Sequence, residues 1–138
     1  MNTVANLVDL EPANRERFTI AELSRDFDVT ARTLRHYEAE GLIAPRREGQ
    51  QRVYSKRDRT RLAWILRGRR VGFSLADIRD LLDIYESEGP ATQQKRLVEK
   101  CRARIAALTE QRRDIDDTIT DLNSFIDAVR DVPARRTA

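Results

Sequence analysis

The sequence contains very few of the residues on which catalytic and metal centres depend. Its 138 residues include one cysteine, Cys101, and one histidine, His36. A single cysteine excludes an internal disulfide and a Cys-x-x-Cys metal or redox pair, and a single histidine excludes a multi-histidine site. Paired nucleophile and base residues and a phosphate-binding glycine loop are missing as well. We therefore expect no enzyme activity, no metal and no cofactor.

Aromatic residues, glycine and proline are also scarce, and no long apolar run is present. Aromatics make up 6% of the chain, whereas charged residues make up 36%. This composition is typical of a mostly helical protein with a small core. No segment approaches the length of a membrane span, and residues 1–17 lack the apolar stretch of a signal peptide. We expect a cytoplasmic protein with no membrane partner.

Positive charge is concentrated in the first half of the chain. Residues 17–72 carry 14 Lys and Arg against 7 Asp and Glu, a net charge of +7, although the whole chain has 26 against 23 and a net charge of +3. The remainder is therefore acidic, with 12 against 16. A basic half favours a polyanionic partner. On charge alone, a solvated helical surface is an equally good interpretation.

Two short helices joined by a tight turn are predicted after residue 18. Thr19 and Glu22 have the spacing of a capping box, and residues 20–27 repeat apolar side chains at helical intervals. Thr30 then caps a second helix over residues 31–40, which Gly41 ends. This pair is a candidate helix-turn-helix.

The second of these helices has a polar face that suits the major groove of DNA. Arginine side chains bind guanine edges, and hydroxyl groups bind phosphates. We expect DNA contacts from Thr30, Arg32, Thr33, Arg35, His36 and Tyr37. His36 is interpreted as a phosphate or base contact, or as merely solvated.

A β-hairpin, or wing, is predicted between residues 44 and 55. Pro45 and Gly49 precede a short alternating stretch at residues 51–54. We expect the wing to lie along the sugar–phosphate backbone through Arg46, Arg47, Arg52 and Tyr54. For Tyr37 and Tyr54, packing inside the head is an equally good interpretation, and the two roles are compatible.

A second pair of helices follows the wing. Ser55 and Asp58 have capping-box spacing at the start of a helix that extends to about residue 70, and Ser74 caps the next one. Trp64 and Phe73 are expected in the core. Three basic residues near the end of the first helix, Arg67, Arg69 and Arg70, are interpreted as solvated, with contacts to flanking phosphates as the alternative.

A long helix is predicted over residues 90–130, ended by Pro133. Its apolar residues alternate at intervals of three and four, which is typical of a coiled coil. The ten core positions are Val98, Cys101, Ile105, Leu108, Arg112, Ile115, Ile119, Leu122, Ile126 and Val129. Nine of the ten are apolar, so we expect this seam to join two copies of the chain. On the seam, Cys101 is interpreted as a small apolar core residue.

The charges on this helix favour an antiparallel pair. Residues 95–104 carry five positive charges and one negative, whereas residues 114–127 carry five negative charges and none positive. An antiparallel arrangement places the basic half of one copy against the acidic half of the other. Arg112 then lies near the two-fold axis and needs a carboxylate from the second copy, such as Glu110 or Asp116.

Several of these stretches together resemble the MerR family of transcriptional regulators. The similar segments are residues 19–23, 29–30, 33–38 and 41–43 of the helix-turn-helix, 52–54 of the wing, and 72–75, 78 and 81–82 of the second helical pair. Residues 49–59 and 65–68 are similar to family members that regulate branched-chain amino acid and fatty-acid degradation genes. The resemblance covers residues 18–86, and the heptad helix occupies the place of the family's dimerisation helix.

The resemblance implies a mechanism and particular contacts. Dimers of the family bind a palindrome in an over-long promoter spacer and distort it so that RNA polymerase engages both promoter elements, which is indirect readout. By position, Arg35 and Tyr37 would contact DNA from the recognition helix, and Arg52 and Tyr54 from the wing. The cysteines of metal-sensing members are missing. The chain ends where multidrug-sensing members begin a ligand domain, so we expect no small-molecule pocket.

The predicted fold is all-α with a small β wing: a winged helix-turn-helix head on a long antiparallel coiled-coil dimerisation helix. We expect an N-terminal arm at residues 1–17, the head at 18–87, the dimerisation helix at 90–130 and a tail at 131–138. The expected partners are double-stranded promoter DNA, RNA polymerase and a second copy of the chain. The alternative is a coiled-coil adaptor whose basic head binds protein.

Overall fold

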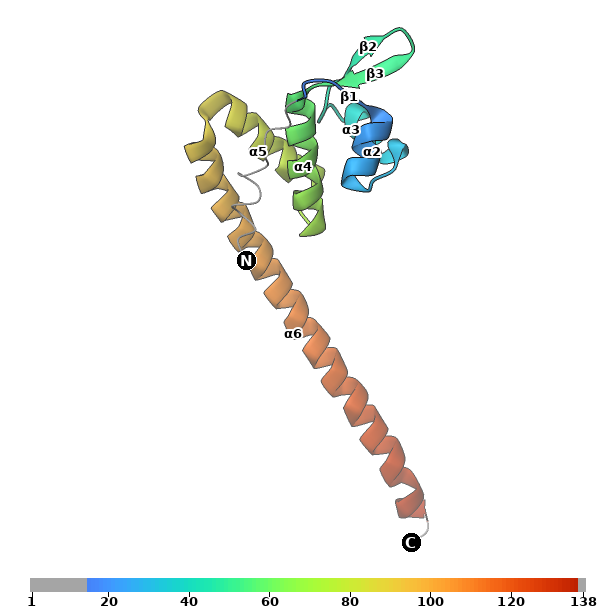
Figure 1. Cartoon of the computed structure of the whole chain (residues 1–138). Helices are drawn as coiled ribbons and strands as arrows, with labels where there is room; N and C mark the ends of the chain where they lie inside the picture. Colours follow the sequence, from blue (N-terminus) through green and yellow to red (C-terminus); the bar gives the residue numbers. More distant parts are fainter. Residues whose placement is uncertain (1–14, 137–138) are drawn as a thin grey trace. The chain divides into compact units, whose positions relative to one another are not determined.

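The computed structural model describes residues 15–136, which form a small sheet and five helices (Figure 1). Contacts divide the chain into a head unit, Met1–Gln94, and a second unit, Lys95–Ala138. The elements in chain order are β1 (Phe18–Thr19), α2 (Ile20–Phe27), α3 (Ala31–Ala39), β2 (Arg46–Glu48), β3 (Gln51–Tyr54), α4 (Lys56–Arg70), α5 (Leu75–Glu88) and α6 (Pro90–Arg136). The predicted order of helices and wing is confirmed.

A capping box starts α2, as predicted. The Thr19 hydroxyl accepts the backbone N–H of Glu22 at 3.1 Å, and the Glu22 carboxylate accepts the backbone N–H of Thr19 at 3.4 Å. Asp28 ends the helix in the left-handed conformation, with φ of 53°. These local hydrogen bonds fix both ends of a helix that is too short to be stable alone.

The recognition helix α3 is also bounded by local signals. Thr30 accepts the backbone N–H of Thr33 at 3.1 Å. After Ala39 the chain reaches Gly41, whose φ of +74° lies in the left-handed region that side chains disfavour. The helix-turn-helix is therefore present with the predicted boundaries, apart from one residue at the C-terminal end.

The wing belongs to a three-stranded antiparallel sheet with the order β1-β3-β2. The β2–β3 hairpin pairs Arg47 with Arg52, and β1 pairs Phe18 with Tyr54. Strand β1 was not predicted, because two residues carry no alternation pattern. It exists through its pairing with β3, and this pairing attaches the wing to the start of the helix-turn-helix.

The second helical pair packs closely against the rest of the head. The buried Asp58 accepts hydrogen bonds at 3.0 Å from the backbone N–H of Ala44 and from the N–H and hydroxyl of Ser55. It therefore caps α4 and also holds the loop that leads into the wing. A Cβ atom on Gly68 would lie 2.8 Å from the Ile78 side chain, so glycine permits the close contact of α4 with α5.

Helix α6 continues farther than predicted. It extends to Arg136, so the expected end at Pro133 and the expected tail from residue 131 are wrong for the described residues. A proline removes one helical hydrogen bond but has a φ close to the helical value, so a final turn can continue past it. No helix formed by residues 15–136 combines the length and the apolar character that a membrane span requires.

Most of the predicted N-terminal arm, residues 1–14, lies outside the described residues. Two of the three described residues of the arm form ion pairs within the head. The guanidinium of Arg15 pairs with Glu22 in α2, and that of Arg17 pairs with Glu48 in β2. The end of the arm is therefore part of the head unit.

Candidate nucleic-acid interface

One face of α3 is exposed and positively charged. The side chains of Arg32, Arg35 and His36 are exposed, whereas Leu34 is fully buried and Tyr37 is 6% exposed. The apolar residues thus anchor the helix, and the cationic residues remain available to a ligand. An exposed helix with this distribution fits the major groove of DNA.

The two threonines at the start of α3 serve the backbone first. The Thr30 hydroxyl caps the helix, and it also lies 3.0 Å from the hydroxyl of Thr33. Both groups remain near the surface, where hydroxyls at a helix N-terminus suit a phosphate. Their predicted role as DNA contacts stays a prediction.

Two further helices, α4 and α5, contribute to this face. An open hollow of about 260 Å³ is lined by Arg32, Thr33, His36 and Tyr37 of α3, together with Arg69 of α4 and Leu75 of α5. The Arg69 guanidinium donates to the backbone carbonyl of Phe73 at 3.0 Å, which orients the side chain. From the sequence, Arg69 is interpreted as solvated. Its proximity to α3 depends on the packing of α4, which the sequence pattern does not show.

The wing is linked to the recognition helix by an acidic residue. Arg47 and Arg52 face each other across β2 and β3, so their like charges repel. Glu38 of α3 accepts the Arg52 Nε–H at 2.7 Å, and its other oxygen lies 4.0 Å from an Arg47 nitrogen. Arg46 and Arg47 are exposed, whereas Arg52 is largely buried. The structure therefore unites the predicted wing and helix residues through Glu38, which the sequence prediction missed.

The predicted DNA contact of Tyr54 needs correction. Its side chain has no exposed surface, and its hydroxyl has no hydrogen-bond partner among the described residues. Burial, followed by the negative charge of Glu38, raises the pKa of Tyr54 above its ordinary value. Tyr54 is a core residue because β3 turns alternate side chains inward. Tyr37 is also mostly buried, but it borders the hollow beside α3.

A buried arginine holds the C-terminal end of the recognition helix. Arg61 is 7% exposed, and its Nε–H donates to the carbonyl of Leu42 at 2.7 Å. The same guanidinium donates to Glu86 of α5 at 3.0 Å. Leu42, two residues beyond α3's C-cap residue Glu40, is fully buried, so α3, α4 and α5 are joined at this point.

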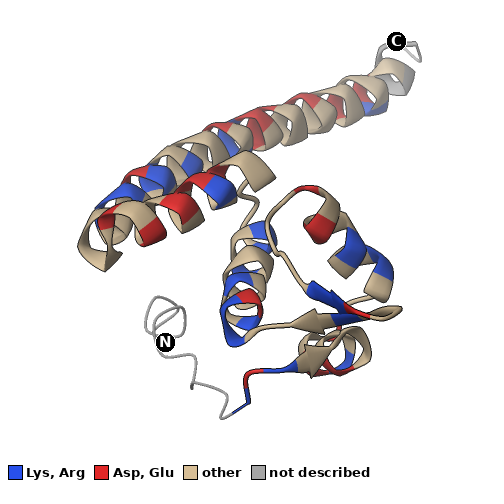
Figure 2. Cartoon of the chain, turned by 90° about the horizontal axis from the view of Figure 1, so that it is seen from above, with Lys and Arg blue, Asp and Glu red and all other residues tan. Residues whose placement is uncertain are grey.

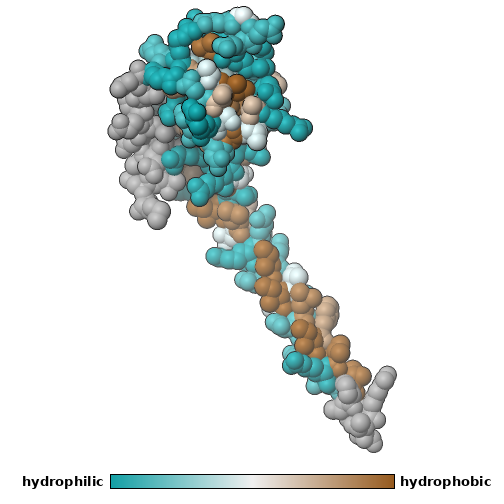
Figure 3. Space-filling model, turned by 45° about the vertical axis from the view of Figure 1, so that its right-hand side comes forward, coloured by the Kyte–Doolittle hydropathy of each residue, from teal (hydrophilic) through white to brown (hydrophobic). Residues whose placement is uncertain are grey.

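The predicted coiled-coil seam is an exposed apolar stripe on α6 (Figure 3). Its exposed members are Val98, Ile105, Leu108, Ile115, Ile119, Leu122, Ile126 and Val129, while Cys101 is half-buried. Phe125 is 65% exposed beside the stripe, and the heptad pattern missed it because it lies outside the core positions. A stripe of this length is unfavourable in water unless a second surface covers it. Figure 2 shows the separation of charge along the same helix, with the basic residues first.

Within residues 15–136, no group of three or more His, Cys, Asp and Glu side chains is arranged to hold a metal ion.

Trp64, expected in the core, is half-buried, whereas Phe73 is buried as predicted. Trp64 instead borders a pocket between α4 and α5.

Comparison with known proteins gives consistent results over most of the chain. Residues 18–84 match the family model described as MerR HTH family regulatory protein, and residues 59–125 match the model described as MerR, DNA binding. The transcriptional regulator ZntR of Escherichia coli strain K12 is 36% identical over 109 residues, which cover 71% of this chain and 75% of ZntR. The regulator HmrR of Rhizobium leguminosarum bv. viciae is 33% identical over 106 residues, covering 72% of this chain and 82% of HmrR.

Solved structures show the same fold. PbrR691 from Ralstonia metallidurans CH34, in complex with lead(II), has a TM-score of 0.62 and 28% identity, covering 77% of this chain and 85% of PbrR691. HiNmlR, a regulator lacking the sensor domain and bound to promoter DNA, has a TM-score of 0.54 and 26% identity. The match covers 72% of this chain and 79% of HiNmlR. These relatives are transcriptional regulators, which favours a DNA-binding head over a protein-binding adaptor.

Proposed function

The chain belongs to the MerR family of helix-turn-helix regulators, and we propose that it binds a palindromic promoter operator as an antiparallel homodimer. It is a DNA-binding transcriptional regulator. The observation that carries the proposal is the link from Arg52 to Glu38, which holds the basic wing beside the basic face of α3. Two surfaces held in this way can contact the major groove and the adjacent backbone together.

Among the proposed contacts, Arg35 reads base edges, and Arg32, His36 and Arg69 bind phosphates near α3. Arg46 and Arg47 bind the backbone from the wing, while Thr30 and Thr33 contribute hydroxyls at the start of the helix. In this division, Arg52 mainly positions the wing, because its Nε–H is already bonded to Glu38. The complex of HiNmlR with promoter DNA supports a DNA-binding role for a head of this fold.

The proposed dimer orientation follows from the charges of α6. An antiparallel pair brings the basic residues 95–104 against the acidic residues 114–127 of the partner subunit, whereas a parallel pair opposes like charges. Each surface pair contributes only about 0–1 kcal/mol, but all contributions favour one orientation. Arg112 would pair with Glu110 or Asp116 of the partner subunit. The apolar stripe on α6 would form the seam.

The proposed mechanism is distortion of DNA. The 47 residues of α6 give a helix of about 70 Å, and antiparallel pairing would place two heads at opposite ends of this rod. Heads at a fixed separation read two half-sites and strain the DNA between them, which is indirect readout. RNA polymerase would then respond to the altered spacer. We propose that this happens in the cytoplasm, and we propose no metal effector, because Cys101 is the one cysteine of the chain.

The function is tested by a mobility shift with the promoter region upstream of the protein's own gene. We expect a specific complex that weakens steeply as salt rises, because binding releases counterions from the DNA. A fragment of equal length with one half-site scrambled is the control. Equal affinity for both fragments would contradict the palindromic operator.

The dimer orientation is tested by oxidation of Cys101. In a parallel pair, the two Cys101 thiols face each other at one core layer, and mild oxidation would give a covalent dimer. We expect the antiparallel protein to stay uncross-linked. In Leu122→Cys, we expect disulfides that join Cys101 of one subunit to the new cysteine at position 122 of the other. Mass spectrometry identifies the joined positions. Disulfides that join only identical positions would overturn the antiparallel arrangement.

A further inference from the structure

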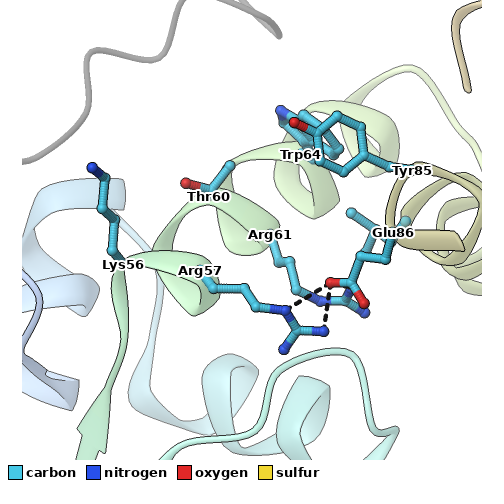
Figure 4. Close-up of a pocket in the computed structure, with 8 residues that line it drawn as sticks. Lys56, Arg57, Thr60, Arg61, Trp64, Tyr85 and Glu86 are labelled. Atoms are coloured by element: carbon cyan, nitrogen blue, oxygen red, sulfur yellow. Dashed lines mark hydrogen bonds and ion pairs between the residues drawn. The ribbon is translucent and has the colours of Figure 1, made fainter. Parts of the chain in front are cut away.

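A pocket of about 330 Å³ lies between α4 and α5, although the sequence predicts no small-molecule pocket (Figure 4). Its lining residues include Lys56, Arg57, Arg61, Trp64, Tyr85 and Glu86. None of these belongs to the proposed DNA contacts. The volume is within the range of natural small-ligand sites, roughly 300–1,000 Å³.

One end of the pocket is aromatic. The rings of Trp64 and Tyr85 meet edge to face, with centroids 5.0 Å apart and planes at 88°. Tyr85 is 42% exposed, and the buried Leu82 adds an apolar wall. Aromatic pairs of this kind favour a further ring in a stacked or edge-on position, because ring edges and faces carry opposite partial charges.

The other end is cationic. Glu86 accepts the Arg57 Nε–H at 2.7 Å and an Arg61 N–H at 3.0 Å, both on the same oxygen. Partial burial raises the pKa of Glu86, but the hydrogen bonds and charges of Arg57 and Arg61 outweigh burial and lower it below its ordinary value. Lys56 also lines the pocket, so the lining carries three cations and one ionised carboxylate, a net charge of +2. A ligand anion would reduce this excess.

We propose that this pocket binds a small aromatic carboxylate, with its ring against Trp64 and Tyr85 and its carboxylate at the Arg57 guanidinium, where the charge of Lys56 adds to the attraction. Apolar walls with a few convergent polar groups are typical of such sites. The cations select a negative head group over a neutral or positive one.

Occupancy of the pocket would be transmitted to the recognition helix through Arg61. This buried side chain joins Glu86 in the pocket to the carbonyl of Leu42, shortly after α3. A ligand carboxylate competes with Glu86 for the arginines and thereby shifts the bond that holds Leu42. This regulation rests on the proposed function, whereas ligand binding itself does not.

The binding test uses the protein's own reporter, because Trp64 is the one tryptophan of the chain. The probes are 3-phenylpropanoate, 3-phenylpropan-1-ol and 3-phenylpropylamine, which share a ring and a linker and differ in head-group charge. We expect 3-phenylpropanoate to change the Trp64 emission saturably, at least about tenfold more tightly than the alcohol. We expect no saturation with the amine. Equal responses to all three probes, or no response to the carboxylate, would overturn the proposal.

The paired variant Lys56→Gln/Arg57→Gln tests the cationic end. We expect it to lose at least about tenfold in affinity for 3-phenylpropanoate. The matched control Arg70→Gln/Arg102→Gln removes two charges outside the pocket and should bind as the original chain does. Circular dichroism checks that both double variants are folded. If either variant is unfolded, the head-group series on the original chain tests the binding proposal by itself. If the Trp64 emission changes with protein concentration and not with probe concentration, a second copy of the chain occupies the pocket. This outcome would refute ligand binding.

The regulatory step is tested by the mobility shift with and without saturating 3-phenylpropanoate. We expect operator affinity to change by at least about fivefold in the original chain, the lower end of common allosteric effects, and to stay constant in Lys56→Gln/Arg57→Gln. Ligand binding with unchanged operator affinity would refute the coupling alone. Absence of operator binding at every condition would refute the proposed function, while the fluorescence result would stand.

Discussion

Glu38 and Arg52 join the recognition helix to the wing: the Arg52 Nε–H donates to a Glu38 carboxylate oxygen at 2.7 Å. Both side chains are mostly shielded from water, with 25% and 22% of their surfaces exposed. Arg47 approaches the same carboxylate from β2. One acidic residue in a basic surface therefore has a positioning role, because it offsets the repulsion between two arginines that face each other.

Glu38→Gln should weaken specific operator binding more than nonspecific binding. The change replaces a charge-assisted hydrogen bond with a weaker neutral one, which loosens the wing on α3, but it also removes a negative charge near the DNA, which favours phosphate contacts. We expect the ratio of specific to nonspecific affinity to fall, with about 0–1 kcal/mol lost from folding stability. Glu40→Gln, which alters an exposed pair with Arg79, is the control. An unchanged ratio in competition mobility shifts would remove the positioning role from Glu38.

Arg35→Ala should reduce operator affinity by about 1–3 kcal/mol, as expected for a base contact from a recognition helix. The side chain is exposed on α3, so its loss leaves the core intact. Arg130→Ala, an exposed arginine of α6 outside the two charged segments of the proposed dimer, provides the matched control for loss of one charge. Affinity equal to that of the control in a titrated mobility shift would exclude Arg35 from recognition.

Ile119→Asp should produce monomers that bind DNA poorly. In the proposed dimer, the new carboxylate would be buried in the α6 seam without a partner, which is strongly destabilising. Thr120→Asp introduces the same charge one residue later, off the predicted seam. Sedimentation should therefore show monomers for the first variant and dimers for the second. Persistence of the dimer in Ile119→Asp would contradict the heptad assignment.

Tyr54→Phe should leave operator binding unchanged and should be at least as stable as the original chain. The substitution deletes a buried hydroxyl that lacks a hydrogen-bond partner among the described residues, and such a group destabilises the folded state. Tyr54→Ala, by contrast, should cost about 3–5 kcal/mol through the cavity it leaves. Thermal unfolding and the mobility shift measure both effects. A clear loss of affinity in Tyr54→Phe would restore this tyrosine to the DNA interface.

Protonation of Glu22 should lower the stability of the head in acid. The hydrogen bond from Arg15 is the main cause that lowers the pKa of Glu22 from its ordinary value of 4.5 to about 2; burial opposes this shift, and the contacts with Thr19 support it. Because the folded-state pKa is the lower one, the contribution is complete above about pH 4.5 and is lost as pH falls toward 2. The difference in Tm between the original chain and Glu22→Gln should shrink over that interval. A constant difference would show that Glu22 acts without its charge.

The sequence by itself determined the local elements. Capping residues such as Thr19, Thr30 and Ser55 satisfy the N–H groups of their own first turns, so the starts of the helices are encoded within four residues. The alternating stretch of β3 and the heptads of α6 are likewise periodic signals along the chain. The family resemblance rests on these same short-range patterns.

Only the tertiary structure decided which side chains meet. The bond from Glu38 to Arg52 spans 14 residues, and that from Arg61 to Leu42 spans 19, so neither follows from a local period. The packing of α4, α5 and the sheet buries Tyr54 and places Trp64 at a pocket. In the sequence, nothing distinguishes these two aromatic residues as buried or pocket-lining. Local hydrogen bonds set the elements, but long-range packing assigns each exposed or buried role, and packing depends on residues far apart in the chain.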